Sequence, residues 1–258
     1  MKYSIHISIL IVTILIMCML IVCIFFKKIE NFDKNYEKQE IVIARYNENL
    51  EWINEEPFNR HPIIVYNKSD NENFSKNNVK KIVNLPNVGR ETHSYLYHII
   101  ENYENLSDTT IFLPGSAELS NKFDRSKNLV TTVENTNKTV LSCIKEENFI
   151  ENNYNFQLDN YLLTNENNKQ INNDSTVKMS DIRPFGKWYE TIFTNEKNEC
   201  ISYNSIIAIS KENILQKPKS YYEKLIKELN THHNPETGHY MERSWYAVFY
   251  PYTNATFI

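Results

Sequence analysis

Two short polar stretches combine residue types that bind phosphate and sugar groups. The first, Arg45-Tyr46-Asn47-Glu48, offers a guanidinium, an aromatic ring, an amide and a carboxylate, which together can grip a base, a ribose or a phosphate. The second, Gly89-Arg90, joins a residue that permits close approach of a ligand to a cation that suits a diphosphate at a helix entrance. The alternative for the first stretch is an ordinary polar turn that caps a helix over residues 50–55.

The apolar pattern predicts the elements that would position these stretches. Runs of β-branched residues at 40–44, 61–66, 80–84 and 109–113 predict four strands. A helix is expected between the last two, because Leu96, Ile99 and Ile100 form one apolar stripe. We therefore expect an α/β fold with a mixed, mostly parallel sheet flanked by helices, in which ligands bind at the carboxyl ends of the strands.

The turn after the fourth predicted strand is a third candidate. It reads Pro114-Gly115-Ser116-Ala117-Glu118, and Glu118 is its one carboxylate. In the simplest right-handed winding this turn lies beside the end of the first strand. We expect Gly115 and Ser116 to border the same site.

The C-terminal part predicts a strand at 201–210 and two helices. Ser220 and Glu223 have capping-box spacing at the start of the first helix. The second helix is expected to begin near His239 and to end at Pro251, so that Glu242 and Arg243 open it. A carboxylate there has a plain alternative explanation in the helix dipole. The spacing of the histidines at 232, 233 and 239 matches no familiar zinc site.

The middle of the chain, 126–180, is Asn-rich, and we interpret it as a variable insertion without chemistry, with strands expected at 130–133 and 140–144. The two histidines of the predicted helix, His93 and His98, lie five residues apart and do not form a chelating pair.

Composition excludes some classes of function. The net charge of -4 argues against nucleic acid as a partner. The chain has only 4 glycines and neither common glycine-rich motif, GxGxxG or GxxxxGK[ST], so a glycine-rich phosphate-binding loop is excluded. Cys143 and Cys200 form a bridge or remain two free thiols, and the sequence leaves both open.

The N-terminal segment is almost wholly apolar between residues 4 and 26, long enough to cross a bilayer. We expect residues 1–28 to be a membrane anchor rather than a cleaved signal peptide, residues 29–39 to be a stalk, and residues 40–258 to form the α/β domain. The expectation is a single-pass protein in the lipid bilayer with its C-terminal domain in the secretory lumen or outside. Six Asn-x-Ser/Thr sequons give only slight support to a lumenal position of the C-terminal domain: Asn67, Asn73, Asn105, Asn137, Asn173 and Asn254.

Several blocks together resemble a known family, the domain of unknown function 3431. They are IVIARYNENLEW, IVYNK, LPNVGRETHSYLYHIIENY and TTIFLPGS, followed late in the chain by SIIAISKENILQKPKSYYEKLI and GHYMERSWYAVF. The resemblance covers about 40–120 and 181–249. Such proteins resemble glycosyltransferases of the GT-A fold, which bind a nucleotide sugar on a Rossmann-like sheet.

The resemblance implies a membrane-anchored glycosyltransferase that moves a sugar from a nucleotide-diphosphate donor to a hydroxyl of a glycan or protein acceptor. It places the donor on Arg45, Tyr46, Asn47, Glu48, Gly89, Arg90, Gly115 and Ser116. The late block implies an acceptor side with His239, Arg243 and Trp245, and Glu242 as the general base.

One departure from the family pattern concerns the metal. GT-A transferases usually carry Asp-x-Asp after the fourth strand to hold Mn²⁺ or Mg²⁺, and this chain has only Glu118 there. Two alternatives follow for the positive charge that the metal would place on the diphosphate. Either Arg45 and Arg90 supply that charge, or Glu118 binds a metal alone. The alternative is a catalytically inactive protein that binds glycan or nucleotide.

Overall fold

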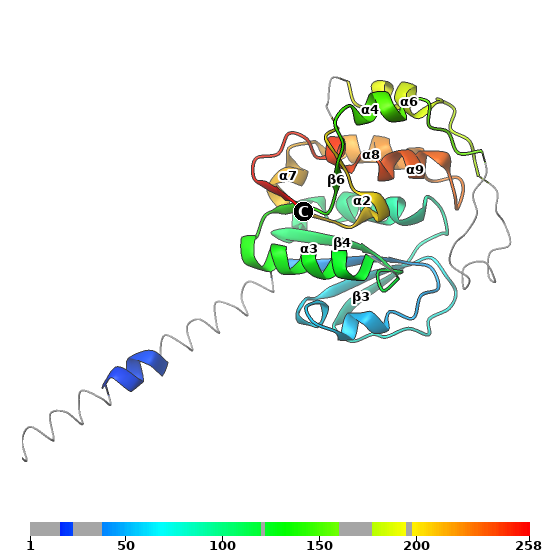
Figure 1. Ribbon diagram of the computed structural model, residues 1–258. Coiled ribbons are helices and arrows are strands. Elements are labelled where there is room, and N and C mark those ends of the chain that lie inside the picture. The colour runs from blue at the N-terminus through cyan, green and yellow to red at the C-terminus, as the bar shows by residue number, and fades with distance from the viewer. Residues whose placement is uncertain (1–15, 23–37, 120–121, 160–176, 195–197) are drawn as a thin grey trace, which may run out of the picture. The chain divides into compact units, whose positions relative to one another are not determined.

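The computed structural model describes residues 16–22, 38–119, 122–159, 177–194 and 198–258 (Figure 1). The chain divides into two units, Met1–Lys38 and Gln39–Ile258. In the first unit, residues 16–22 form a helix with exposed side chains.

Within the described ranges no helix has both the length and the apolarity to cross a membrane. This finding corrects the expected single-pass anchor and the localisation that depended on it. Most of the predicted span, residues 1–15 and 23–28, lies outside the described residues.

The second unit is built on a seven-stranded mixed sheet in the order β3-β2-β1-β4-β8-β5-β9. Its strands are β1 (Gln39–Arg45), β2 (Ile63–Asn67), β3 (Val79–Asn84), β4 (Thr109–Pro114), β5 (Thr139–Leu141), β8 (Ile207–Ser210) and β9 (Ala255–Phe257), and a separate pair consists of β6 (Ile144–Lys145) and β7 (Cys200–Ile201). The four strands expected from the sequence pair in parallel, while β8 is antiparallel to both β4 and β5. The expected mixed, mostly parallel sheet is therefore confirmed.

Helices cover both faces of the sheet. The described helices are α2 (Arg90–Glu101), α3 (Lys122–Thr136), α4 (Phe149–Asn153), α6 (Phe185–Ile192), α7 (Lys211–Leu215), α8 (Lys219–Lys227), α9 (Glu236–Glu242) and α10 (Trp245–Val248), with short 3-10 turns η1 (Glu51–Asn54), η2 (Phe58–Arg60), η3 (Tyr103–Asn105) and η4 (Tyr203–Ser205).

Alternation along the strands separates the core into two layers. Val42 and Phe112 point to one layer, where they pack with residues of α2, α6, α8, α9 and α10. Their neighbours Ile41 and Ile111 point to the other layer, where they pack with α3, η1 and η2. Because both faces are buried, these strands consist of nearly continuous apolar runs, as a parallel sheet requires.

Three predicted elements in the first part of the chain and around η4 were wrong. The strand expected at 130–133 is part of α3, in which Ser126, Leu129, Val130 and Val133 form a buried helical stripe. The expected strand 201–210 is interrupted by η4, where Asn204 has φ 68 and so breaks the ladder. The helix expected at 50–55 is only the 3-10 turn η1.

Candidate functional site

The candidate site lies at the carboxyl ends of β1, β2, β3 and β4. The strand order reverses between β1 and β4, which leaves a switch point where Ala44 pairs with Pro114. Arg45, Asn67 and Asn84 end their strands in one row across β1, β2 and β3. Open α/β sheets bind ligands at such an edge.

Arg45 is only 1% exposed, and its guanidinium binds the protein itself. Nε donates to the Glu48 carbonyl at 2.7 Å, and Nη1 donates to Asn67 Oδ1 and to the Asn71 carbonyl, both at 2.6 Å. The guanidinium also lies 4.2 Å from the centre of the Phe74 ring. Where we expected a diphosphate, the structure has loop carbonyls, so Arg45 joins the loops that follow β1 and β2.

Glu48 organises the turn after β1 and packs against the turn after β4. Its Oε2 accepts from the backbone N–H of Tyr46 at 2.8 Å and of Asn47 at 3.1 Å. A methyl group on Gly115 would lie 2.7 Å from the same oxygen. Gly115 therefore packs closely against Glu48, and the two turns do meet at the switch point.

A hollow of about 600 Å³ opens beside this turn. We call it the rim hollow; it is lined by Tyr46, by residues 67–70 with Glu72, and by residues 84–87. Its wall therefore comes from the ends of β1, β2 and β3. Asn67, one of the six sequons, is 1% exposed and bound to Arg45, so its side chain belongs to the packing of this edge.

Lys68 connects the rim hollow to the start of α2. Its Nζ donates to the carbonyls of Val88 and Arg90. Burial lowers the pKa of Lys68 to about 7. The negative charge of Glu91 raises this pKa, and the positive charge of Arg90 lowers it. Gly89 has φ 63, and an added methyl would lie 2.7 Å from Leu229 Cβ, so only glycine lets the start of α2 approach the segment that follows α8 this closely.

Arg90 presents its side chain at the same edge, 27% exposed. Its Nε lies 3.7 Å from Glu91 Oε2, and its Nη1 lies 3.4 Å from Asn234 Oδ1. Arg90 and Arg45 therefore lie at one edge of the sheet, linked through Asn67 and its neighbour Lys68. Of the two guanidiniums, the one of Arg90 is more open to a ligand.

Two carboxylates, Glu91 and Glu242, bind adjacent residues of η4. Glu242 Oε1 accepts from the Asn204 N–H at 2.5 Å, and Glu91 Oε1 accepts from Ser205 Oγ at 3.4 Å. Asn204 and Ser205 both have positive φ, 68° and 54°, which is a costly backbone conformation. In this conformation the Asn204 N–H and the Ser205 hydroxyl donate to the two carboxylates.

The environment separates the pKa values of these two carboxylates. Burial and the charge of Glu91 raise the pKa of Glu242, against the charges of Arg90 and Arg243. Burial also opposes ionisation of Glu91, but the charge of Arg90 and then those of Lys122 and Lys68 hold its pKa below the ordinary value. Such a divided pair is typical of acid–base chemistry. We did not predict Glu91 as a site residue, although it directly follows Arg90.

Glu242 ends α9, whereas we expected it to open a helix. Pro235 fixes the start of α9 at Glu236, so the carboxylate lies in the last turn. The helix dipole disfavours a negative charge there, which removes the plain alternative explanation for this residue.

The three residues expected on the acceptor side differ in exposure. Trp245 is fully buried and donates from Nε1 to Ser205 Oγ at 3.0 Å, so it supports η4 from the core. His239 is buried beside Asn234 Oδ1 at 2.8 Å, and burial, with the charges of Arg90 and Arg243, lowers its pKa to about 2. Arg243 is partly exposed and lies 3.9 Å from the centre of the Phe156 ring.

The turn after β4 offers a cation where the family pattern has a metal ligand. Lys122 Nζ donates to Ser116 Oγ at 3.1 Å, while Glu118 is exposed. In the part of the chain that the structure describes, no group of three or more His, Cys, Asp or Glu side chains could hold a metal ion.

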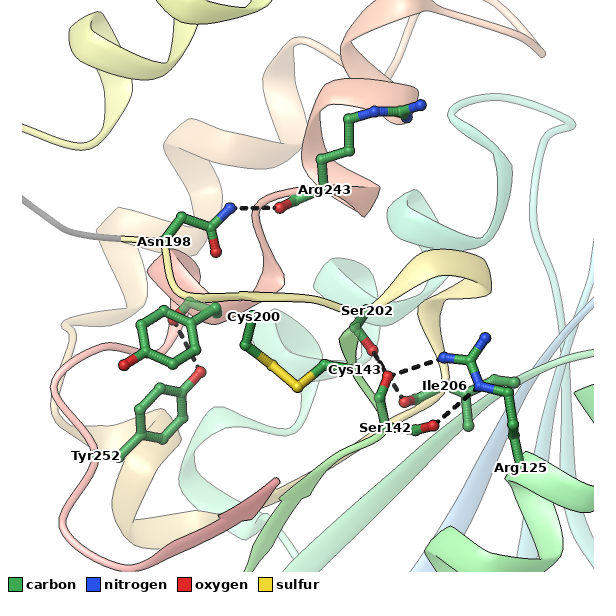
Figure 2. Close-up of a disulfide and its surroundings, with 10 residues drawn as sticks. Arg125, Ser142, Cys143, Asn198, Cys200, Ser202, Ile206, Arg243 and Tyr252 are labelled. Carbon is green, nitrogen blue, oxygen red and sulfur yellow. Dashed lines mark hydrogen bonds between the residues drawn. A yellow bond between two sulfur atoms is a disulfide. The ribbon is translucent and has the colours of Figure 1, made fainter. Parts of the chain in front are cut away.

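A disulfide holds the chain that leads into η4 (Figure 2). It joins Cys143 to Cys200, which settles the alternative that the sequence left open. Ser202 Oγ donates to the Ser142 carbonyl at 2.7 Å, and Arg125 Nη2 donates to the same carbonyl at 3.0 Å. The disulfide at Cys200 and the hydrogen bonds of Ser202 therefore hold the segment that leads to Asn204 and Ser205 in place.

The fold and the site define a mixed α/β protein with a polar site at a sheet switch point. Residues 41–256 match the model of a protein family described as a protein of unknown function, DUF3431, and the chain belongs to that family. No curated protein and no solved structure matches this chain.

Proposed function

We propose that this protein is a glycosyltransferase that moves a sugar from a nucleotide-diphosphate donor to a hydroxyl group of a glycan or protein. The observation that carries the proposal is the rim hollow, which opens at the carboxyl ends of β1–β3 beside a charged switch point. A mixed, mostly parallel sheet flanked by helices is also the architecture that the GT-A resemblance implies.

The rim hollow suits the nucleoside of the donor. Asp70 and Glu72 provide carboxylates that accept hydrogen bonds from ribose hydroxyls, and Tyr46 provides a ring for the base. Amides at Asn67, Asn84 and Asn87 line the same wall. The hollow has the size of a small-molecule site.

The diphosphate would lie between the rim hollow and the turn after β4. Arg90 and Lys122 border that position, and a cation beside the leaving group stabilises the negative charge that develops as the glycosidic bond breaks. In this proposal Arg90 takes the role that we first gave to both arginines, and Arg45 holds the loops.

Glu242 would act as the general base that removes the proton of the acceptor hydroxyl. Its raised pKa makes it a stronger base than a solvated carboxylate, and the Asn204 N–H fixes the orientation of one oxygen. Glu91 stays ionised beside it and so favours uptake of a proton by Glu242.

The test uses the full chain and a panel of UDP-, GDP- and CMP-sugars, with and without Mn²⁺, with release of the nucleotide as the readout. We expect release from one donor class, and a rate that rises with pH through the pKa of Glu242. Glu242→Gln keeps the oxygen that accepts from Asn204 but removes the base, so the rate should fall about 10²–10⁴-fold. Glu223→Gln, on exposed α8 surface, is the matched control and should leave the rate unchanged.

A catalytically inactive protein that binds nucleotide or glycan is the second candidate. The single carboxylate in the turn after β4 favours it. Tight binding of a nucleoside diphosphate, with no turnover of any donor in the presence of Mn²⁺, would select this candidate over the transferase.

A further inference from the structure

A second and larger hollow lies away from the carboxyl edge of the sheet. It measures about 960 Å³ and is formed by α4 and α6, which pack side by side, together with residues 145–148 and 198–199 (Figure 1). None of the residues placed in the proposed transferase site lines it. We call it the acidic hollow.

Its charge is strongly one-sided. Among the lining residues that the structure describes, Lys145 is the only cation, and five are carboxylates: Glu146, Glu147, Glu151, Glu190 and Glu199. Glu147, Glu151 and Glu199 are exposed and form no ion pair with any residue that the structure describes. Like charges gathered at one hollow repel each other, and a bound cation relieves that repulsion.

The inner wall favours the same kind of ligand. Tyr189 and Phe193, both buried, form the apolar part of this wall. Asn198 is 5% exposed and also lines it. Its Nδ2 donates to the Arg243 carbonyl at 2.6 Å, while its Oδ1 has no partner among the described residues (Figure 2). Because buried amide oxygens are usually hydrogen-bonded, this oxygen in the wall of the hollow is available to accept from a bound N–H donor.

We propose that the acidic hollow binds a flexible chain bearing several ammonium groups. Carboxylates and an amide oxygen share one preference, a positively charged N–H donor. The volume exceeds that of one ammonium group, so the ligand is a polyamine or a lysine-rich peptide segment. The proposal does not depend on the transferase function.

The test measures binding to the full chain by calorimetry and by thermal shift at physiological salt. The probes are spermine and an acetylated, amidated tetralysine, with the matching tetraserine as the uncharged control. We expect saturable binding of at least one cationic probe, a rise in the melting temperature, and no effect of tetraserine. Spermine alone would assign the site to free polyamines, and tetralysine alone to a protein segment.

The variant Glu147→Gln/Glu199→Gln locates the site. Both side chains are exposed, so the fold should survive, and removing two charges should weaken binding by about 10-fold. Glu101→Gln/Glu104→Gln makes the same change of net charge on exposed residues elsewhere and should leave the affinity unchanged.

Three results would overturn the proposal. The first is no binding of either cationic probe. The second is an equal loss of affinity in both double variants, which would reveal attraction to net charge alone. The third is a thermal shift with Ca²⁺ alone as large as that with spermine, which would make the occupant a metal ion.

Discussion

At the scale of single residues, the two arginines have different environments. Arg45 is buried and donates to four oxygens of the protein, whereas Arg90 is part-exposed at the edge where a ligand would bind. Sequence position alone made them equivalent, because both lie in polar turns that follow a predicted strand. Only the contacts distinguish a residue that holds loops from one that can hold a ligand.

This difference gives the first prediction. Arg45→Ala leaves buried carbonyls without donors and should lower the free energy of unfolding by about 3 kcal/mol. Arg90→Ala should cost less than Arg45→Ala, because its side chain is 27% exposed, yet it should weaken binding of the donor nucleotide. Urea unfolding and calorimetric titration of both variants test this, and an unchanged affinity in Arg90→Ala would remove Arg90 from the site.

The second prediction concerns Lys68, whose pKa is lowered by burial from 10.5 to about 7. Between those two pH values the unfolded chain binds a proton that the folded chain does not. Stability should therefore rise with pH across this window, by at most about 1.4 kcal/mol per pH unit, and should be flat with respect to this group below pH 7. Lys68→Met should remove that rise. Urea unfolding from pH 6.5 to 9.5 is the measurement, and an identical slope in the variant would contradict it.

At the scale of elements, strands were easier to predict than helix ends. The four parallel strands appear as expected: the apolar runs of β1, β2 and β4 are largely buried, whereas β3 is an exposed edge strand that its β-branched residues still indicated. The capping box at Ser220 and Glu223 did not form, since Pro218 already starts α8 at Lys219 and no side-chain cap is present. The last helix is two short ones, α9 and α10, and Pro235 decides where the first begins.

The turn after β4 carries the third prediction. Gly115→Ala places a methyl 2.7 Å from Glu48 Oε2, so the carboxylate that accepts from Tyr46 and Asn47, or the backbone beside it, must shift. We expect a loss of about 1–3 kcal/mol in the free energy of unfolding, together with weaker donor binding. Gly238→Ala is the matched control, because its methyl would lie 3.7 Å from the nearest atom and α9 gains a better helix former. Equal effects of the two variants would refute the close fit between the turns.

At the scale of the whole molecule, the disulfide joins segments separated by 57 residues. In the chain-entropy model, removing it with Cys143→Ala/Cys200→Ala should lower the free energy of unfolding by about 4 kcal/mol. Cys18→Ala, which alters the exposed free cysteine of the described residues, should leave it unchanged. Urea unfolding with and without reductant measures both, and reductant should have no effect on the double variant.

The sequence by itself determined the α/β class, the four parallel strands, the helix 90–101 and the family, because burial on two faces and helical periodicity leave marks in local composition. Only the tertiary structure decided three features of the protein. It brought Glu91 close enough to Glu242 for their charges to interact, it buried Arg45 and Trp245, and it joined Cys143 to Cys200. Each of these depends on segments that are distant in the chain and meet in space. Local residue types record which face of an element is apolar, but not which distant segment covers it.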